Sequence, residues 1–415
     1  MTRVIHTGDT HIGYRQYNAP ERRRDFLRAF RRVADDAMDL DVDAVVHAGD
    51  LFHDRRPGLV DLQSTLSVLR DLDDAGIPFL AVVGNHEGKR DAQWLDLFAD
   101  LGLATRLGRE PYRLGEVALY GLDFVPRSRR EDLEYEFADH DGDHAALVTH
   151  GLFSPFAHAD WETETLLAEA DVEFDALLLG DNHEPGTAKV EDTWVTYCGS
   201  TERASASERE SRGYNVVEFD DAVEIRRRGI ESREFVFVDV TLHEGEGGDV
   251  VRERVGEYDV EDAVVVVTVE GEGEPITPAT IETAASERGA LVARVTDRRE
   301  IDEETEVSVN FADPDEAVRK RVRDLGLSDA ARDIDRVVRD DDLADANVRD
   351  AIERRVREGL EESAAFEPAS GEGGDGTDAE SDEAAKAPES EASDDSEAGK
   401  PTDESDDQIS IGEFS

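Results

Sequence analysis

The apolar residues of positions 2–230 follow two alternating patterns. Short, nearly continuous apolar runs are typical of strands buried on both faces, and longer stretches with apolar residues at helical spacing are typical of amphipathic helices. Helical spacing occupies residues 20–38 and 59–76. The principal expected strands are RVIHTG (3–8), DAVVHAG (43–49), PFLAVVG (78–84), AALVTHG (145–151) and DALLLG (175–180).

Later apolar runs at 193–200, 213–220 and 222–228 predict a strand-rich end to the same domain. The order of strands and helices is typical of a layered α/β fold, and we place this domain at residues 1–230.

The rest of the chain divides into three shorter regions. Residues 231–312 predict a small α+β unit with strands at 233–242, 262–271 and 290–297, and with a helix that begins at Thr277 and Pro278. Residues 313–363 have a helical pattern. Residues 364–415 are too poor in apolar groups to form a core, which predicts a disordered acidic tail.

The chain of 415 residues carries a formal net charge of −55. The tail does not explain this charge: residues 367–407 hold 16 acids and 2 lysines, a net of −14, which leaves −41 for the rest. Basic residues comprise 41 arginines and 5 lysines. A surface rich in carboxylates and poor in lysine suits a cytoplasm at molar salt, where self-repulsion is screened. We therefore expect a protein of a halophilic archaeon.

The single cysteine, Cys198, excludes an internal disulfide and fits a reducing interior. The N-terminus enters a strand at once, without the pattern of a signal peptide. No apolar run approaches the roughly 18 residues of a membrane helix. These features predict a soluble cytoplasmic protein with no membrane partner.

Each of the five principal strands ends in side chains that can bind a metal ion. In open α/β sheets, ligands gather beyond the carboxyl ends of the strands, so strands that pair side by side are expected to bring these groups together. One such tip is usually an ordinary turn, but five in one domain indicate a metal site. His6 and His47 lie within strands and are expected to be core or supporting groups. The candidate side chains are Asp9, His11, Asp50, Asn85, His86, His150, Asp181 and His183.

Oxygen and nitrogen ligands without thiolates suit manganese, iron or zinc, and a bridging carboxylate suits a two-metal centre. Two metal ions roughly 3.5–4 Å apart can activate a water molecule and neutralise a pentacovalent phosphate. The reaction predicted from these residues is phosphoester hydrolysis.

The ordered series D-x-H, GD, GNHE, H and GDxH resembles the calcineurin-like metallophosphoesterase superfamily. More closely, HTGDTHIGY, AGDLFHDRRP, VVGNHE and YCGSTER resemble DNA double-strand-break repair nucleases of the meiotic-recombination-eleven type, whose bacterial counterpart is the SbcD subunit. The resemblance implies a metallophosphoesterase sandwich at residues 1–230, a cap domain that contacts DNA at 231–312, and an ATPase-binding region at 313–363.

The resemblance also implies two Mn²⁺ ions per chain, with Asp50 bridging them. It assigns Asp9, His11 and His183 to one ion, and Asn85, His150 and Asp181 to the other. His86 would contact the scissile phosphate, with His53 beside it.

Position 181 departs from the family, which usually has histidine there. A carboxylate is still a good manganese ligand, so we expect an occupied second site with altered affinity. The negative charge of Asp181 would make the metal-bound water less acidic and would disfavour the binding of a phosphate.

The implied partners are DNA, a second copy of the chain and a coiled-coil ABC ATPase of the Rad-fifty type. The helix at 20–38 would help form the dimer contact through Phe26, Leu27 and Phe30, unless these residues pack on their own sheet. Arginine clusters in residues 15–32, 53–57 and 126–130 can bind phosphates, or can form local ion pairs. The C-terminal residues Gln408, Ile411 and Phe414 have the spacing of a sliding-clamp (PCNA) binding peptide, although chance could also produce it.

The predicted function is a manganese-dependent DNA nuclease of double-strand break repair. The resemblance implies 3′-to-5′ exonuclease activity on duplex ends and endonuclease activity on single strands, at the nucleoid. Two alternatives stay open. One is a small-substrate metallophosphodiesterase or phosphatase, and the other is a repair scaffold with a weak or idle metal site.

Overall fold

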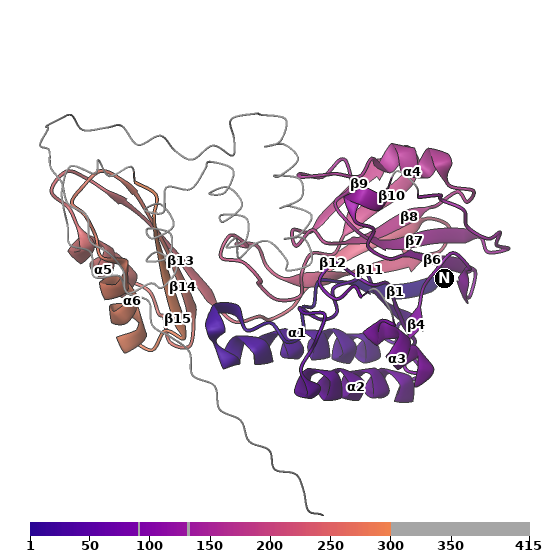
Figure 1. Ribbon diagram of the computed structural model, residues 1–415, viewed down its shortest axis with the longest axis horizontal. Helices are drawn as coiled ribbons and strands as arrows, with labels where there is room; N and C mark the ends of the chain where they lie inside the picture. The colour runs from indigo at the N-terminus through magenta and orange to yellow at the C-terminus, as the bar shows by residue number, and fades with distance from the viewer. Residues whose placement is uncertain (90–91, 131–132, 300–415) are drawn as a thin grey trace, which may run out of the picture. The chain divides into compact units, whose positions relative to one another are not determined.

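The computed structural model describes residues 1–89, 92–130 and 133–299, and this part confirms the layered α/β fold (Figure 1). Two mixed six-stranded sheets form its centre. The first has the order β12 (Val223–Gly229), β11 (Gly213–Phe219), β1 (Thr2–Thr7), β2 (Ala44–His47), β3 (Phe79–Ala81) and β4 (Thr105–Arg106). The second has the order β5 (Tyr112–Leu114), β6 (Val117–Leu122), β7 (His144–His150), β8 (Ala176–Gly180), β10 (Thr193–Tyr197) and β9 (Gly186–Val190).

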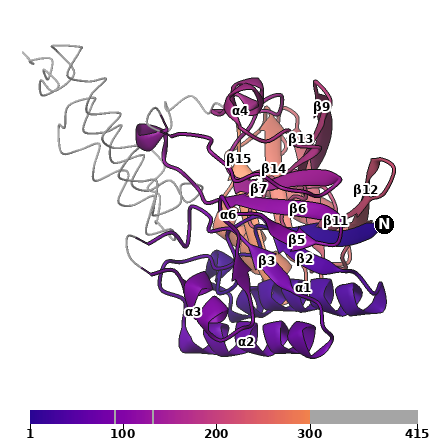
Figure 2. The same cartoon turned by 90° about the vertical axis from the view of Figure 1, so that its right-hand side faces the viewer.

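Four α-helices cover the outer faces of the two sheets (Figure 2). Three pack against the first sheet: α1 (Pro20–Asp39), α2 (Leu59–Asp74) and α3 (Trp94–Asp100). The fourth, α4 (Thr163–Glu169), packs against the second sheet through Leu166. Two short 3-10 helices complete this part of the chain, at Gln16–Asn18 and Arg127–Arg129.

The strands are almost wholly apolar because each of their faces is buried against a different layer. In β1, Ile5 contacts the helix layer, whereas the adjacent Val4 points between the two sheets. In β8, Leu178 lies between the sheets and Leu177 faces α4. Alternate residues of a strand point to opposite faces, so a strand covered on both sides needs apolar residues at every position.

The apolar face of α1 packs on its own sheet. Phe26 and Phe30 are fully buried within the chain, and Phe30 belongs to the core between the helices and the first sheet. The prediction that these two residues form a dimer contact is therefore wrong. Leu27 is partly buried against the same core.

The smaller unit contains a three-stranded parallel sheet with the order β13 (Phe235–Leu242), β14 (Val264–Gly271), β15 (Val292–Asp297). Its helices are α5 (Gly248–Gly256), which was not predicted from the sequence, and α6 (Pro278–Glu287). Both helices pack in one apolar core with this sheet. A second apolar cluster joins Phe235, Val264 and Val292 to Ala19, just before α1.

The expected helical region at 313–363, the acidic tail and the C-terminal residues Gln408, Ile411 and Phe414 lie outside the described residues. None of the helices in the described part of the chain combines the length and the apolar composition that a membrane span requires.

Candidate metal centre

The candidate ligands come from strands of both sheets, not from one. β1, β2 and β3 are parallel neighbours in the first sheet, and β7 and β8 are parallel neighbours in the second. The expectation that all five strands pair side by side is therefore wrong. The two sheets stack face to face, and the loops beyond their carboxyl ends meet, which still brings the predicted side chains together.

The loops that carry the ligands turn sharply as the strands end. Asp9, His11, Asp50 and Asp181 have positive φ values of 49°, 42°, 57° and 90°. Such a conformation costs a non-glycine residue on the order of 1 kcal/mol or more, and it persists where the surrounding structure enforces it. Gly49 has a φ of 93°, and a Cβ there would lie 2.6 Å from His150 Nδ1, so only glycine allows this close approach.

One group of ligand atoms comes from Asp9, His11 and His183, and these atoms all lie within 4.8 Å of one another. The Nε2 atoms of His11 and His183 are 3.0 Å apart, so both imidazoles point to the same place. Asp9 also accepts hydrogen bonds of 3.1 and 3.2 Å from the main-chain N–H of Asp181. This contact ties the loop after β1 to the loop after β8.

A second group comes from Asp9, Asp50 and His150. Asp50 Oδ2 lies 3.8 Å from His11 Nε2 and 3.5 Å from His150 Nε2, between the two groups. Asp181 Oδ1 lies 3.7 Å from His150 Nε2. The same oxygen accepts a hydrogen bond of 3.2 Å from the Asn85 amide nitrogen.

The donor atoms fit a pair of divalent cations. His150 Nδ1 donates to the Ala48 carbonyl at 2.8 Å, so in the neutral ring the lone pair is on Nε2, the nitrogen that faces the carboxylates. Within the described part of the chain, His150 Nε2 and Asn85 Oδ1 are buried and have no hydrogen-bond partner. An unsatisfied buried polar atom costs about 1–3 kcal/mol, and a cation at this place would remove that cost.

The electrostatics of the metal-free site favour a cation. Burial raises the pKa of Asp9 to about 6, and the nearby carboxylates of Asp50 and Asp181 act in the same direction, against the opposing effect of His183 and His150. Burial likewise raises the pKa of Asp181. A raised carboxylate pKa means that the ionised form is destabilised, so a bound cation would stabilise it.

His86 and His53 lie on the more open side of the site. The His86 main-chain N–H donates to Asp50 Oδ1 at 3.0 Å, and its Nδ1 donates to the His53 carbonyl at 2.9 Å. The ring centroids of His86 and His53 are 5.0 Å apart, and that of His11 is 4.7 Å from His86. Burial, aided by His86, lowers the pKa of His53 to about 3, so His53 is neutral.

His6 and His47 are fully buried and belong to none of the ligand groups among the described residues. His47 Nε2 lies 3.0 Å from Thr10 Oγ1, in the loop that carries Asp9 and His11. His47 thus supports this loop, as expected. The structure provides no hydrogen bond to the ring nitrogens of His6 within the described residues.

Two supporting carboxylates were not among the predicted site residues. Glu87 accepts the N–H groups of Leu51, Phe52 and Gly84 and so joins the loops after β2 and β3. It follows Asn85 and His86 in the GNHE motif, which is a signal that could have indicated it. Glu208 contacts His183 from a stretch of serines, alanines and charged residues that has no recognisable motif.

Comparison with known proteins identifies the family of the chain. The model of the calcineurin-like phosphoesterase family matches residues 2–194. The chain is 66% identical over 359 residues to the DNA double-strand break repair protein Mre11 of Haloferax volcanii, covering 86% of this chain and 81% of that one. It is 60% identical over 371 residues to the protein of the same name from Halobacterium salinarum, covering 88% of this chain and 96% of that one.

Proposed function

The chain belongs to the Mre11 family of DNA double-strand break repair proteins, and from this premise we propose that it is a manganese-dependent DNA nuclease. The proposed activities are 3′-to-5′ exonuclease on duplex ends and endonuclease on single strands. The observation that carries the proposal is the convergence of Asp9, Asp50 and His150 with His11 and His183 at one edge of the sandwich.

In the proposed assignment, Asp9, His11, Asp50 and His183 hold one Mn²⁺, and Asp50, Asn85, His150 and Asp181 hold the other. Asp50 is the proposed bridge because its Oδ2 lies within 4 Å of a histidine nitrogen from each set. The pair of ions would supply Lewis acidity and a metal-activated water for in-line attack on a phosphodiester.

The proposed role of His86 is to bind the scissile phosphate. Its Nδ1 is occupied by the His53 carbonyl, and its Nε2 lies 4.0 Å from Asp50 Oδ2, so Nε2 faces the site. A protonated Nε2 can donate to a phosphate oxygen or to the departing 3′ oxygen. His53 sits beside His86, and the Tyr14 ring stacks on it with the centroids 3.9 Å apart, which fixes its orientation.

The arginines of α1 do not supply a DNA surface in this proposal. Each of its six arginines lies within ion-pair distance of a carboxylate of the chain. The arginines of this cluster therefore form local ion pairs and are not the proposed site of phosphate binding.

The two shorter arginine clusters are better candidates for contact with DNA phosphates. Arg55 and Arg56 are exposed, follow His53 and Asp54 in the same loop, and pair with no carboxylate among the described residues. The same holds for Arg127 and Arg129, which follow Phe124, whose ring centroid is 6.1 Å from that of His150. In a chain with a net charge of −55, exposed cations that lie near the site and pair with none of the described carboxylates indicate a place for a polyanion.

The proposed homodimer contact uses α2 and α3 in place of α1. Leu59, Val60, Leu97 and Leu101 are 71%, 62%, 42% and 52% exposed and are apolar. Trp94 Nε1 donates to the Arg55 carbonyl at 3.0 Å, which holds the start of α3 to the loop before α2. A second copy of the same face would bury these four apolar residues, as an isologous contact requires.

The proposed partners beyond DNA and the second copy are an ABC ATPase of the Rad-fifty type, bound through residues 313–363, and a sliding clamp, bound through Gln408, Ile411 and Phe414. The proposed location is the nucleoid of a halophilic archaeon. Both relatives quoted above are haloarchaeal, which supports this source.

The test compares two substrate classes at molar KCl with Mn²⁺: an end-labelled linear DNA duplex and bis-p-nitrophenyl phosphate. The nuclease proposal expects cleavage of the duplex and its loss in His86→Ala. Hydrolysis of the small diester without DNA cleavage, even after addition of the ATPase, would favour a small-substrate phosphodiesterase. Inactivity toward both substrates, together with retained DNA binding, would favour a scaffold.

A further inference from the structure

The imidazole of His183 is held between the metal centre and a buried carboxylate. Its Nδ1 lies 2.8 Å from Glu208 Oε1, and its Nε2 lies 3.0 Å from His11 Nε2. Glu208 is only 6% exposed and belongs to the loop between β10 and β11. The two ring nitrogens therefore face different partners, with the carboxylate on one side and the metal ligands on the other.

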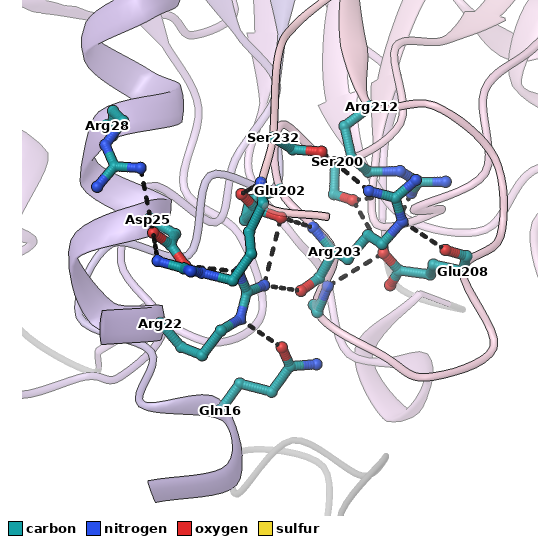
Figure 3. Close-up of polar contacts among 12 residues, drawn as sticks. Gln16, Arg22, Asp25, Arg28, Ser200, Glu202, Arg203, Glu208, Arg212 and Ser232 are labelled. Atoms are coloured by element: carbon teal, nitrogen blue, oxygen red, sulfur yellow. Dashed lines mark hydrogen bonds and ion pairs between the residues drawn. The ribbon is translucent and has the colours of Figure 1, made fainter. Parts of the chain in front are cut away.

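Glu208 is itself fixed by several donors (Figure 3). Its Oε2 accepts hydrogen bonds from Arg212 Nη1 at 3.1 Å, the Ala204 N–H at 3.0 Å and Ser200 Oγ at 3.4 Å. Arg212 is fully buried, so its guanidinium and the Glu208 carboxylate form a buried ion pair. Such a pair holds its geometry much better than an exposed pair of long side chains.

The same groups also hold the main chain of His183. Arg212 Nη1 and the Ser200 N–H donate to the His183 carbonyl at 3.0 and 3.2 Å. Arg203 Nε donates to the Glu208 carbonyl at 3.0 Å, which fixes the backbone on the other side of the contact. His183 is thus held at its carbonyl and at its ring by residues of one loop.

We propose that Glu208 is a positioning residue for the metal centre. As the acceptor of the Nδ1–H of His183, its carboxylate selects the tautomer whose Nε2 lone pair faces Asp9 and His11, and it makes that nitrogen a stronger ligand. Arg212 keeps Glu208 in place. This inference rests on the proposed two-metal site, and it adds a residue outside the ligand set.

The alternative is that Glu208 serves only as the counter-ion of Arg212 and stabilises the loop. Glu208→Ala alone would not separate the two roles, because it leaves the Arg212 charge buried. Glu208→Gln keeps an acceptor oxygen for Nδ1–H and the shape of the side chain, but it removes the charge. The matched control is Glu210→Ala, which removes an exposed carboxylate from the same loop.

The experiment titrates Mn²⁺ alone into the metal-stripped full-length protein at molar KCl, with calorimetry and electron paramagnetic resonance of free Mn²⁺. Thermal unfolding without metal runs in parallel. Glu208→Ala is expected to weaken one of two Mn²⁺ sites by about 10- to 100-fold. Glu208→Gln is expected to weaken the same site less, while its metal-free melting temperature stays closer to wild type. Glu210→Ala should leave both sites unchanged.

Two results would overturn the inference, and they are distinguishable. If the wild type binds two Mn²⁺ ions and Glu208→Ala binds both with unchanged affinity, the positioning role fails and the metal centre stands. The role also fails if each variant loses affinity only in proportion to its loss of folded metal-free protein. If the wild type binds no Mn²⁺, the proposed metal centre fails and this inference fails with it.

Discussion

Replacement of Arg22 by alanine tests how strongly a buried network of ion pairs stabilises the fold. Arg22 lies in α1, is fully buried, and donates four hydrogen bonds. They reach Gln16 Oε1 at 3.0 Å, Asp25 Oδ2 at 2.8 Å, Glu202 Oε1 at 3.3 Å and the Arg203 carbonyl at 2.8 Å (Figure 3). The guanidinium therefore joins α1 to the loop that carries Glu208.

The expected loss in the free energy of unfolding depends on which partners Asp25 and Glu202 keep once Arg22 is removed. Asp25 retains the guanidinium of Arg233, which donates to its two oxygens at 2.5 and 3.0 Å. Within the described residues, Glu202 loses its only ion-pair partner and keeps main-chain N–H donors. Removing one member of a buried pair costs about 3–5 kcal/mol, and we expect the lower end because Asp25 stays paired.

The assay is urea unfolding at molar KCl, followed by tryptophan fluorescence, for the wild type, Arg22→Ala and Arg24→Ala. Arg24 pairs with Glu21 and is 67% exposed, so its replacement should change the free energy of unfolding by less than about 0.5 kcal/mol. Salt screens the exposed pair and not the buried one, so the difference should persist in KCl. A loss below about 1 kcal/mol for Arg22→Ala, or equal losses for both variants, would show that the buried ion pairs of Arg22 do not stabilise the fold.

Four further outcomes are expected. Arg55→Ala combined with Arg56→Ala should weaken DNA binding and lower its salt slope by about one or two, measured by fluorescence anisotropy, while Arg24→Ala combined with Arg28→Ala leaves it unchanged. Asp181→His removes a negative charge that repels the DNA phosphate, so the apparent KM for DNA should fall roughly fivefold. An unchanged or higher KM would show that this repulsion does not limit DNA binding. Protons compete with Mn²⁺ for Asp9, whose pKa burial raises to about 6, so Mn²⁺ affinity measured by calorimetry should fall as the pH drops through that value. Leu59→Asp combined with Leu101→Asp should yield a monomer in sedimentation velocity, and a dimer of unchanged affinity would exclude this face.

The strands and the principal helices could be predicted from the sequence because burial on two faces leaves a strong apolar signal. The run at 175–180 became β8, and residues 59–76 became α2. The candidate ligands could be predicted for a related reason: Asp9, Asp50 and Asp181 each follow directly after such a run.

The assembly of the site from two sheets could not be predicted, because strand patterns do not specify which strands share a sheet. The sequence also does not show which arginines are buried in ion pairs and which are exposed. Arg22 and Arg55 both lie in basic clusters of the sequence, yet one is buried in an ion-pair network and the other is exposed without a carboxylate partner among the described residues. Glu208 lies in a stretch whose composition is typical of a linker, and only tertiary contact with His183 distinguishes it.

The proposed function requires that the chain hydrolyses DNA phosphodiesters with two Mn²⁺ ions bound at this site. Its most direct measurement is the release of label from a 3′-labelled linear duplex at molar KCl as a function of Mn²⁺ concentration, for the wild type and Asp50→Ala. We expect Mn²⁺-dependent release of the label by the wild type and none by a folded Asp50→Ala at any Mn²⁺ concentration. Release by Asp50→Ala at the wild-type rate, or release by the wild type in the presence of a chelator, would contradict it.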